Sequence, residues 1–443
     1  MNNTLRVSLI SLFALSALAN EFDPVVCRGV TRAHDPVGYA IGEEMVFELS
    51  FENAPSSLFD GTCRLDWKRQ GDDGKTLAGS IVLDGSAPIE IITSLDRPGF
   101  VFVTADVVRV SDGSPVCRDI LAHGAHEWEG LGRELHFALG AGAKIDEIAP
   151  AMEEPEDFDE FWARQKARLA AVPVRSEETP MDFGDEDFNF WRIKVDCAGP
   201  RPVFGILAVP KNAKPKSLKA VVEVHGYGVF RQSRPWGTAS DRILFSINAH
   251  GVDPLCDDVA YAEFEDGIRT PKWTYAFSPH QNEYPEGCYF NGMALRVMRA
   301  FDYIRTRSEW NGVDLEVEGG SQGGAQSLWA AGLVEGLTEA RPEVPWMCDV
   351  NAPLAGRFLS PWRLGYAPGL AYYDAIFHAR RAKCFVNVKR AGLGDDVCVP
   401  SGIAAMFNNL PEGRRRILWI QGARHGHVPP PPAQEIELGE HRD

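Results

Sequence analysis

The feature that most constrains this chain is a glycine-rich pentapeptide, Gly319-Gly-Ser-Gln-Gly323, which spells G-x-S-x-G. Residues 313–318 before it alternate like a strand, and residues 324–331 after it form a small-residue run typical of a helix. Glycines permit a tight strand-to-helix turn that holds the serine out from the backbone, and the helix N-terminus adds partial positive charge beside it. This context predicts that Ser321 is the nucleophile of an acyl-transfer reaction.

The pentapeptide has two other possible interpretations. Many short matches of this kind are ordinary glycine-rich turns, and only the flanking strand and helix patterns favour catalysis here. A phosphate-binding loop would need a G-x-G-x-x-G pattern or a lysine-serine pair, and neither occurs at this position. The turn is therefore interpreted as the nucleophile elbow of an α/β-hydrolase.

A serine nucleophile needs an orienting carboxylate, which follows the serine in the chain order of α/β-hydrolases. Gly392-Leu-Gly-Asp395 comes directly after an apolar stretch, residues 385–389, that reads as the penultimate sheet strand. We assign Asp395 to this role. Asp396 is the immediate competitor, and Asp349, which follows an earlier strand, is the distant one.

The general base should follow the last strand, residues 417–421. The loop after it carries two histidines, His425 and His427, separated by one glycine. We assign His427 as the base, while His425 could replace it on spacing alone. A His-x-His metal pair is the remaining alternative, and it lacks an obvious third ligand nearby.

An oxyanion hole takes two backbone N–H donors, one after the nucleophile and one from an earlier strand loop. Gln322 supplies the first. The turn Val224-His-Gly-Tyr-Gly228 closes an apolar strand, and we assign the second donor to the Tyr227 amide.

Bulk composition limits the class of partner. The chain has 443 residues, of which 44% are hydrophobic and 24% charged, as in an ordinary globular protein. Its net charge of −17 repels phosphate backbones, so no nucleic-acid partner is expected. Neutral or cationic substrates are easier to accommodate.

The N-terminus reads as a secretory signal peptide spanning residues 1–19. Arg6 precedes a twelve-residue apolar stretch, Val7 to Leu18, which is short for a membrane span. Ala17-Leu-Ala19 then matches an A-x-A cleavage signal. We expect cleavage near Ala19, a secreted or periplasmic protein, and no stable membrane insertion.

Nine cysteines are compatible with export but give no dense disulfide pattern. The number is odd and no C-x-x-C pair occurs, which disfavours both a zinc cluster and a disulfide scaffold. Cys348 and Cys384 are expected to be buried thiols, and Cys256 with Cys288 is the bridge considered. No metal and no cofactor are predicted.

Two domains are expected after the signal peptide. Residues 24–143 alternate over several short stretches separated by turn clusters, which predicts an all-β immunoglobulin-like sandwich. Residues 140–143 are interpreted as a linker or turn. Residues 150–443 begin with a helix from about 154 to 171 and then alternate strands and helices, which predicts a mostly parallel sheet. Strands are expected at 204–209, 220–225, 242–248, 315–318, 346–350, 385–389 and 417–421, a helix at 292–305, and an extended tail at 429–432.

Taken in order, these motifs resemble the acetyl xylan esterase and cephalosporin C deacetylase family of carbohydrate esterases over roughly residues 150 to 430. The matching segments are Asp157-Phe-Asp-Glu-Phe-Trp162, His225-Gly-Tyr-Gly228, Tyr289-Phe-Asn-Gly292, Gly319-Gly-Ser-Gln-Gly-Gly324, Gly392-Leu-Gly-Asp395 with Pro400-Ser401, and Gly426-His427.

The resemblance implies an α/β-hydrolase fold with Ser321, Asp395 and His427 as triad and with oxyanion contacts from Tyr227 and Gln322. It also implies a preference for short acyl esters, chiefly acetyl groups on sugars, and a homo-oligomer. Three features depart from the family pattern. Residues 248–253 replace its Arg-Gly-Gln loop, Val428 stands where Glu usually follows the catalytic histidine, and compact cytosolic members lack the all-β N-terminal domain.

The sequence therefore predicts a secreted serine esterase that hydrolyses acetyl esters on carbohydrates. A second hypothesis keeps the triad and changes the bond, as in a peptidase or a uronate methylesterase, for which Arg231 and Arg234 could bind a carboxylate. A third hypothesis is a non-catalytic carbohydrate-binding protein that uses the sandwich.

Overall fold

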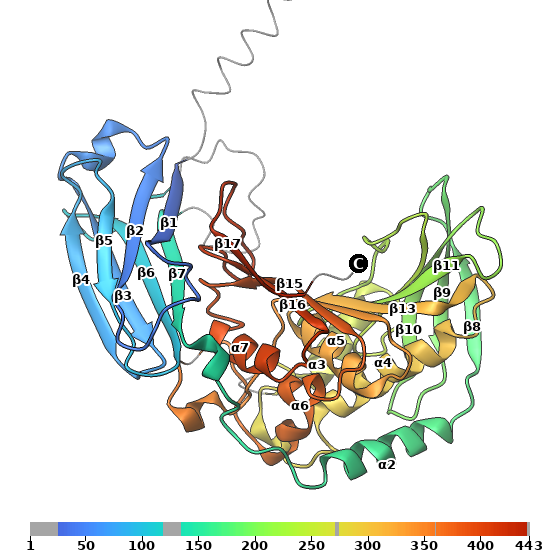
Figure 1. The fold of residues 1–443 in the computed structure, drawn as a ribbon. Helices are drawn as coiled ribbons and strands as arrows, with labels where there is room; N and C mark the ends of the chain where they lie inside the picture. The colour runs from blue at the N-terminus through green and yellow to red at the C-terminus, as the bar shows by residue number, and fades with distance from the viewer. Residues whose placement is uncertain (1–24, 118–133, 271–273, 359, 441–443) are drawn as a thin grey trace, which may run out of the picture.

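The computed structural model describes residues 25–117, 134–270, 274–358 and 360–440. The predicted signal peptide lies outside these residues. None of the helices in the described ranges is both long and apolar enough to cross a membrane. The chain forms an all-β part, blue in Figure 1, followed by a larger part with one central sheet.

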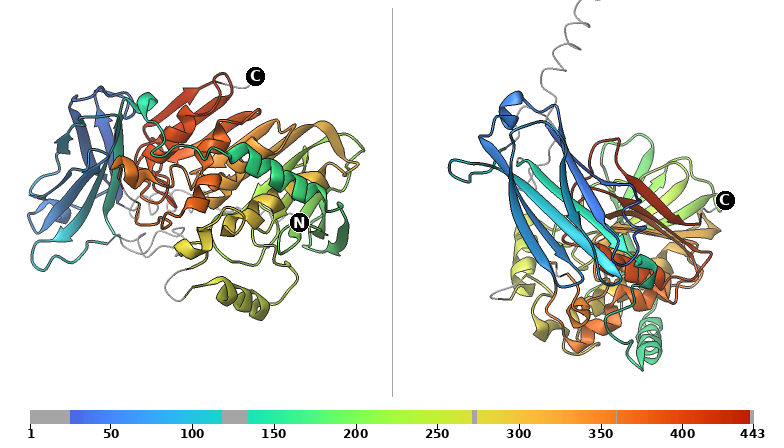
Figure 2. Two further views of the ribbon diagram at one scale, coloured as in Figure 1. Left: turned by 90° about the horizontal axis from the view of Figure 1, so that it is seen from below. Right: turned by 60° about the vertical axis from the view of Figure 1, so that its left-hand side comes forward.

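The N-terminal part consists of two antiparallel sheets packed face to face (Figure 2). Their inward residues alternate along each strand, as in β2, where Met45, Phe47 and Leu49 are fully buried. Phe47 of one sheet and Val103 of the other belong to the same apolar core. The first sheet contains β1 (Val26–Arg32), β2 (Met45–Glu52) and β5 (Ile89–Thr93), and the second contains β4 (Thr76–Val82), β3 (Cys63–Gly71), β6 (Gly99–Arg109) and β7 (His136–Ala143).

A sandwich of two sheets was expected, and all seven strands lie within the predicted limits of 24–143. Its immunoglobulin-like character stays a prediction, as do the domain limits themselves.

The second part is built on a ten-stranded sheet with the order β17-β16-β15-β14-β13-β11-β12-β10-β9-β8. Strands β11 to β16 run parallel to one another, while β17 at one edge and β10, β9 and β8 at the other pair antiparallel. The predicted, mostly parallel sheet is therefore confirmed. The bounds are β8 (Ser176–Met181), β9 (Phe188–Val195), β10 (Val203–Pro210), β11 (Leu218–Val224), β12 (Arg242–Ile247), β13 (Trp310–Gly320), β14 (Glu339–Glu343), β15 (Phe385–Gly392), β16 (Arg415–Ile420) and β17 (Glu435–Gly439).

Helices α4 to α7 lie on one side of this sheet, drawn below it in Figure 1. Helix α4 packs against the sheet, and nearly all of its side chains are buried. The predicted helix at 292–305 matches it closely. The helices are α2 (Phe158–Ala170), α3 (Asp258–Ile268), α4 (Tyr289–Ile304), α5 (Gln322–Leu333), α6 (Ala375–Ala379) and α7 (Pro400–Asn408), with short 3-10 helices η1 (Ser56–Phe59), η2 (Ile145–Glu147), η3 (Pro279–Asn282), η4 (Ala352–Ala355) and η5 (Pro368–Tyr373).

The opposite face of the sheet carries charged side chains that pair across strands. Val317 points into the apolar core, so its neighbours Glu316 and Glu318 point away from it. Arg341 of β14 pairs with both glutamates, and Lys389 of β15 lies 3.2 Å from Glu318. Charges at alternate positions are thus satisfied by neighbouring strands.

This charge pattern explains one wrong strand prediction. The predicted strand at 346–350 is irregular, and the strand in that place is β14, whose sequence is Glu-Ala-Arg-Pro-Glu. Its outward positions carry ion pairs instead of apolar residues, so it lacks the expected hydrophobic run. Residues 346–350 form a buried or half-buried loop, in which Met347 and Asp349 have positive φ angles.

A second correction concerns residues 140–143, predicted as a linker. They are the end of β7, paired with β6. Only glycine fits at position 140, because the chain after β15 passes directly over it. A side chain there would overlap the Leu393 carbonyl oxygen. The predicted tail at 429–432 likewise leads back into the sheet, since β17 pairs with β16.

The two parts are joined by contacts along β7. A methyl group on Gly394 would overlap the Ala138 carbonyl, so the two backbones touch. The Gln421 side chain donates to the Gly140 carbonyl at 2.8 Å and accepts from the Gly140 amide at 3.0 Å. Both groups are buried, so the pair is well shielded from water. The sandwich therefore packs against the loops that follow β15 and β16.

We expect Gly140→Ala to lower the free energy of unfolding by about 1–3 kcal/mol, because the added carbon must displace the backbone at Leu393. Chemical denaturation followed by tryptophan fluorescence measures this loss. Gly85→Ala is the matched control: it lies in the same sandwich with open space around it, and should change stability by less than about 0.5 kcal/mol. Equal stability of the two variants would refute the close approach.

Candidate active site

Ser321 stands at the turn between β13 and α5, in a conformation that few residues adopt. Its φ is 57° and its ψ is −118°, a strained combination for a residue with a side chain. Side chains on Gly319 or Gly323 would overlap the Val224 carbonyl oxygen at the end of β11. The elbow thus presses on the neighbouring strand, and both glycines are needed for it to fit.

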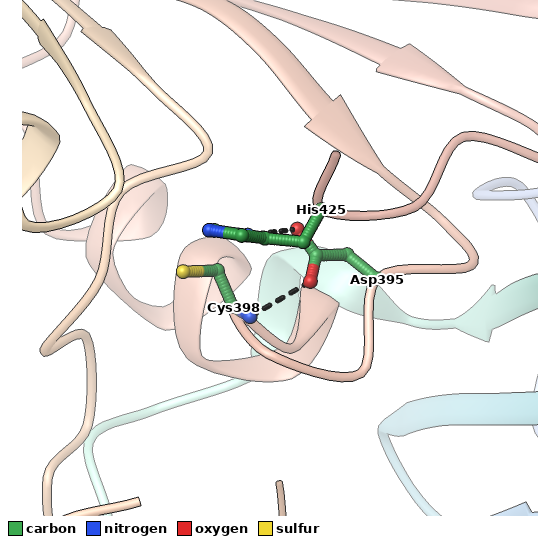
Figure 3. Close-up of side chains that lie close together, drawn as sticks. All are labelled: Asp395, Cys398 and His425. Atoms are coloured by element: carbon green, nitrogen blue, oxygen red, sulfur yellow. Dashed lines mark hydrogen bonds and ion pairs between the residues drawn. The ribbon is translucent and has the colours of Figure 1, made fainter. Parts of the chain in front are cut away.

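A chain of two hydrogen bonds links Ser321 to a buried carboxylate. The Nε2 atom of His425 lies 3.0 Å from the Ser321 hydroxyl, and its Nδ1 lies 3.1 Å from Asp395 Oδ2 (Figure 3 shows the histidine and the aspartate). The other carboxylate oxygen, Oδ1, accepts from the amides of Val397 and Cys398 at 2.8 and 2.9 Å. Asp395 is therefore held in place on both sides, with no side-chain exposure.

The structure corrects the predicted base. His425, and not His427, contacts Ser321. Arg424 and His427 form a bridge in which each amide donates to the other's carbonyl, at 2.8 and 3.3 Å. This tight turn places His425 at its tip facing the elbow, and carries His427 beyond it.

His427 instead lines a small cavity of about 30 Å³ with Leu139 of β7 and Pro429. Sequence spacing allowed both histidines, and only the turn's pairing distinguishes them. Val428 follows His427, the histidine predicted to be catalytic. Because the histidine at Ser321 is His425, the residue to compare with the family's glutamate is Gly426.

The predicted orienting acid is the one the structure brings to the histidine. Asp349, the distant alternative, pairs with Arg357 and accepts from the Ala151 amide at 2.9 Å. Asp396 neighbours Asp395, and burial, followed by the charge of Asp395, raises the pKa of its carboxyl. Asp395 is thus the carboxylate of the hydrogen-bonded chain.

The segment predicted to complete the oxyanion hole lies against the elbow. A carbon placed on Gly226 would be 3.9 Å from Ser321 Cβ. The Gln322 side chain bridges the two segments: it accepts from the Tyr275 hydroxyl at 2.9 Å and donates to the Gly226 carbonyl at 3.4 Å. Gln322 directly follows Ser321, Gly226 lies against it, and the role of the Tyr227 and Gln322 amides as oxyanion donors stays a prediction.

His225, in the same segment, has a structural role. Its Nε2 accepts from the Ala249 amide at 2.9 Å. Burial lowers the pKa of His225 to about 4, so the ring is neutral at physiological pH and suited to accept that bond. This bond anchors the segment 225–228 to the residues that follow β12.

A small apolar cavity of about 70 Å³ adjoins the elbow. Trp346, whose amide donates to the Ser321 carbonyl at 3.0 Å, forms one wall, and Trp362 and Cys398 also line it. Tyr227 packs edge-on against both tryptophans at 5.7 and 5.3 Å between ring centres. This space is enough for a small acyl group.

A larger cavity of about 480 Å³ lies on the charged face of the sheet, lined by Glu223, Glu318 and Arg341 among others. Gly319 and Gly320, which precede Ser321, also line it. The hydrogen-bonded chain and the tryptophan-lined cavity, and not this larger cavity, therefore mark the candidate site.

All nine cysteines lie in described residues, and none of them forms a disulfide there. The bridge considered between Cys256 and Cys288 is absent, because the Cys288 thiol is buried and donates to the Asn282 side chain at 3.2 Å. Cys384 is buried as expected, while Cys348 is half-buried in the irregular loop rather than in a strand.

Comparisons with known proteins find esterases that are similar to this chain. Residues 140–353 match the family of acetyl xylan esterases. A curated relative, the acetyl esterase Axe7A of Xylanibacter ruminicola, is 24% identical over 306 residues, which are 64% of this chain and 66% of the relative. The chain thus spans slightly less than two thirds of that protein.

Solved structures share the fold. An acetyl xylan esterase from Paenibacillus sp. R4 superimposes with a TM-score of 0.51 at 22% identity, covering 65% of this chain and 94% of that one. Acetyl xylan esterase 1 from Thermoanaerobacterium sp. JW/SL YS485 gives 0.52 at 19% identity, covering 64% and 92%.

Together with the family match, these findings confirm the predicted resemblance to the acetyl xylan esterase family, whose members are carboxylic ester hydrolases. The match begins at residue 140, in β7 at the end of the sandwich.

The geometry predicts which histidine activates Ser321. His425→Ala should slow covalent labelling of Ser321 by a fluorophosphonate by about three orders of magnitude or more, because the hydroxyl loses its proton acceptor. His427→Ala is the matched control, two residues away, and should stay within about threefold of the unsubstituted protein. Mass spectrometry of the labelled peptide measures both. Slow labelling in the 427 variant and normal labelling in the 425 variant would reverse the assignment.

Proposed function

We propose that this protein is a serine esterase that hydrolyses acetyl esters on carbohydrates. The observation that carries the proposal is the hydrogen-bonded chain from Ser321 through His425 to Asp395, with links of 3.0 and 3.1 Å. A hydroxyl, an imidazole and a buried carboxylate in this order form the constellation that activates serine for attack on a carbonyl carbon.

In the first half-reaction Ser321 Oγ attacks the acetyl carbonyl carbon while His425 Nε2 takes the hydroxyl proton. Asp395, hydrogen-bonded to Nδ1, fixes the tautomer that leaves Nε2 free to accept and stabilises the imidazolium that forms. The tetrahedral intermediate collapses as His425 returns the proton to the departing sugar oxygen. An acetyl group is then bound to Ser321.

In the second half-reaction water attacks the acetyl-enzyme. His425 removes a proton from the water and gives it to Ser321 as the acetate leaves. Both tetrahedral intermediates carry an oxyanion, for which the amides of Gln322 and Tyr227 are the proposed donors. Each donor of this kind stabilises the transition state by about 3 kcal/mol. The chemistry needs no cofactor.

Two observations support acetyl as the acyl group. The cavity beside the elbow holds only about 70 Å³, and its tryptophan walls are packed against Tyr227 and Phe277, which leaves them little freedom to yield. The family match and the names of the similar proteins point to acetyl esters as well. Trp362, 38% exposed at the mouth, offers an aromatic face to the sugar.

The alternative of a uronate methylesterase loses its main support. Arg234 pairs with Asp185 at 2.5 Å, and Arg231 donates to the Pro254 carbonyl and lies 3.5 Å from Asp258. Both guanidinium groups therefore already contact partners within the protein. A peptidase would use the same triad, and a panel of peptide substrates separates it from an esterase.

We further propose that the protein is exported after cleavage near Ala19, that the sandwich is immunoglobulin-like, and that the chain forms a homo-oligomer. A role of the sandwich in binding polysaccharide is part of the non-catalytic alternative. The close packing of β7 against the loops after β15 and β16 favours a structural role instead.

Ser321→Ala should reduce acetate release from acetylated xylan by about four to six orders of magnitude, since the nucleophile is removed. Enzymatic determination of acetate measures the rate. Ser217→Ala, which removes a surface hydroxyl hydrogen-bonded to Lys214, is the control and should retain the full rate. Comparable turnover by the 321 variant would refute the mechanism.

The size of the cavity predicts a sharp acyl preference. The kcat/KM for p-nitrophenyl acetate should exceed that for the butyrate by at least about tenfold, because Trp346 and Trp362 are packed against other aromatic rings and leave less room for two further methylenes. Initial rates across the acetate, propionate and butyrate esters test this. A butyrate ester hydrolysed as well as the acetate would contradict the acetyl assignment while leaving the triad intact.

A further inference from the structure

The proposed active site contains a thiol that the mechanism does not use. Cys398 lies three residues after Asp395, and its amide donates to the Asp395 carboxylate at 2.9 Å. This bond turns the loop back on itself, so the sulfur comes to lie beside the His425 ring (Figure 3). One ligand atom each from Asp395, Cys398 and His425 lie within 4.8 Å of one another.

Ser321 completes this group. Its hydroxyl is 3.0 Å from His425 Nε2 and interacts with the Cys398 thiol. The sulfur, one imidazole nitrogen and one carboxylate oxygen therefore lie close together, with the Ser321 hydroxyl at the other ring nitrogen. Thiolate and imidazole are the ligands that Zn²⁺ prefers, and a carboxylate is a common third. Ligands of a tetrahedral zinc are separated by roughly 3.5 Å, so a small inward movement suffices.

We propose that Asp395, Cys398 and His425 form an inhibitory site for Zn²⁺ and similar soft divalent cations. Binding breaks the S–H bond of Cys398, releases its proton to solvent and forms a metal–sulfur bond, with no change of oxidation state. One thiolate and one carboxylate neutralise the two charges of the cation. The occupied site thus carries no net charge, whereas a net charge in a buried region would oppose binding.

The inhibition, though not the binding, rests on the proposed function. His425 Nε2 is the acceptor for the Ser321 proton, and Nδ1 is held by Asp395. Whichever nitrogen coordinates the cation, the hydrogen-bonded chain is interrupted. The metal enters from the solvent side, where the His425 side chain is 24% exposed, while Cys398 lies behind it at 3%.

Without a cation the thiol does not replace Ser321 as nucleophile. Burial, followed by the charge of Asp395, raises the pKa of Cys398 well above its usual value, so the sulfur keeps its proton. A bound divalent ion reverses this balance, because a coordinated thiol is deprotonated.

The first test titrates metal-free protein with ZnCl₂ and follows hydrolysis of p-nitrophenyl acetate. Unsubstituted protein should lose activity, and chelation with EDTA should restore it. Cys398→Ser should need at least about tenfold more zinc for the same loss, because its hydroxyl stays protonated and binds poorly. Cys256→Ser, a half-buried thiol elsewhere in the chain, is the control and should respond like the unsubstituted protein. MgCl₂, a hard cation, should have no effect.

The second test needs no catalysis. Added CoCl₂ should give a near-ultraviolet thiolate-to-cobalt absorption band in the unsubstituted protein and in Cys256→Ser, and the band should be absent from Cys398→Ser. Thermal unfolding of each variant checks that it is folded. Absence of the band in the unsubstituted protein, or equal zinc sensitivity with and without Cys398, would overturn the proposal. A cobalt band in a protein without esterase activity would refute the proposed function and leave the metal site standing.

Discussion

The candidate site depends on the contact between the elbow and the end of β11. Gly319 and Gly323 both press against the Val224 carbonyl oxygen, and this packing holds Ser321 at a φ of 57°. Strain of this kind costs on the order of 1–3 kcal/mol and persists only where the surroundings determine it. Because residues 225–228 follow β11 directly, the same contact also brings Gly226 against Ser321.

The second requirement is that two further loops reach the elbow. These loops follow β15 and β16, and they are tied to each other by the Gly394 amide, which donates to the Ala423 carbonyl at 2.9 Å. The Arg390 side chain donates to the Arg424 carbonyl at 3.2 Å and so anchors the histidine turn from the sheet side. On the other side both loops rest on β7 of the sandwich. The N-terminal part therefore belongs to the scaffold of the site, although the family match covers only its last strand.

Local patterns predicted most of the elements correctly. The alternation in β2, the helical run of α4 and the glycine-flanked serine each depend on a few neighbouring residues, and each appears where it was expected. The prediction failed at β14, where ion pairs with neighbouring strands replace apolar residues. It also failed at Gly140, where a glycine typical of a turn instead makes room for a distant backbone. In both cases the deciding contact comes from residues far away in the sequence.

By itself, the sequence determined the elbow and predicted Ser321 and Asp395 as the residues that the fold brings to one histidine, because a strand, a tight turn and a helix are local events and chain order restricts the partners. It could not choose between His425 and His427, since both follow the last strand at suitable spacing. Only the tertiary structure decided this: the bridge between residues 424 and 427 turns one ring toward Ser321 and the other toward the sandwich. The same is true of Cys398, whose place beside the triad arises from a folded loop that no spacing rule anticipates.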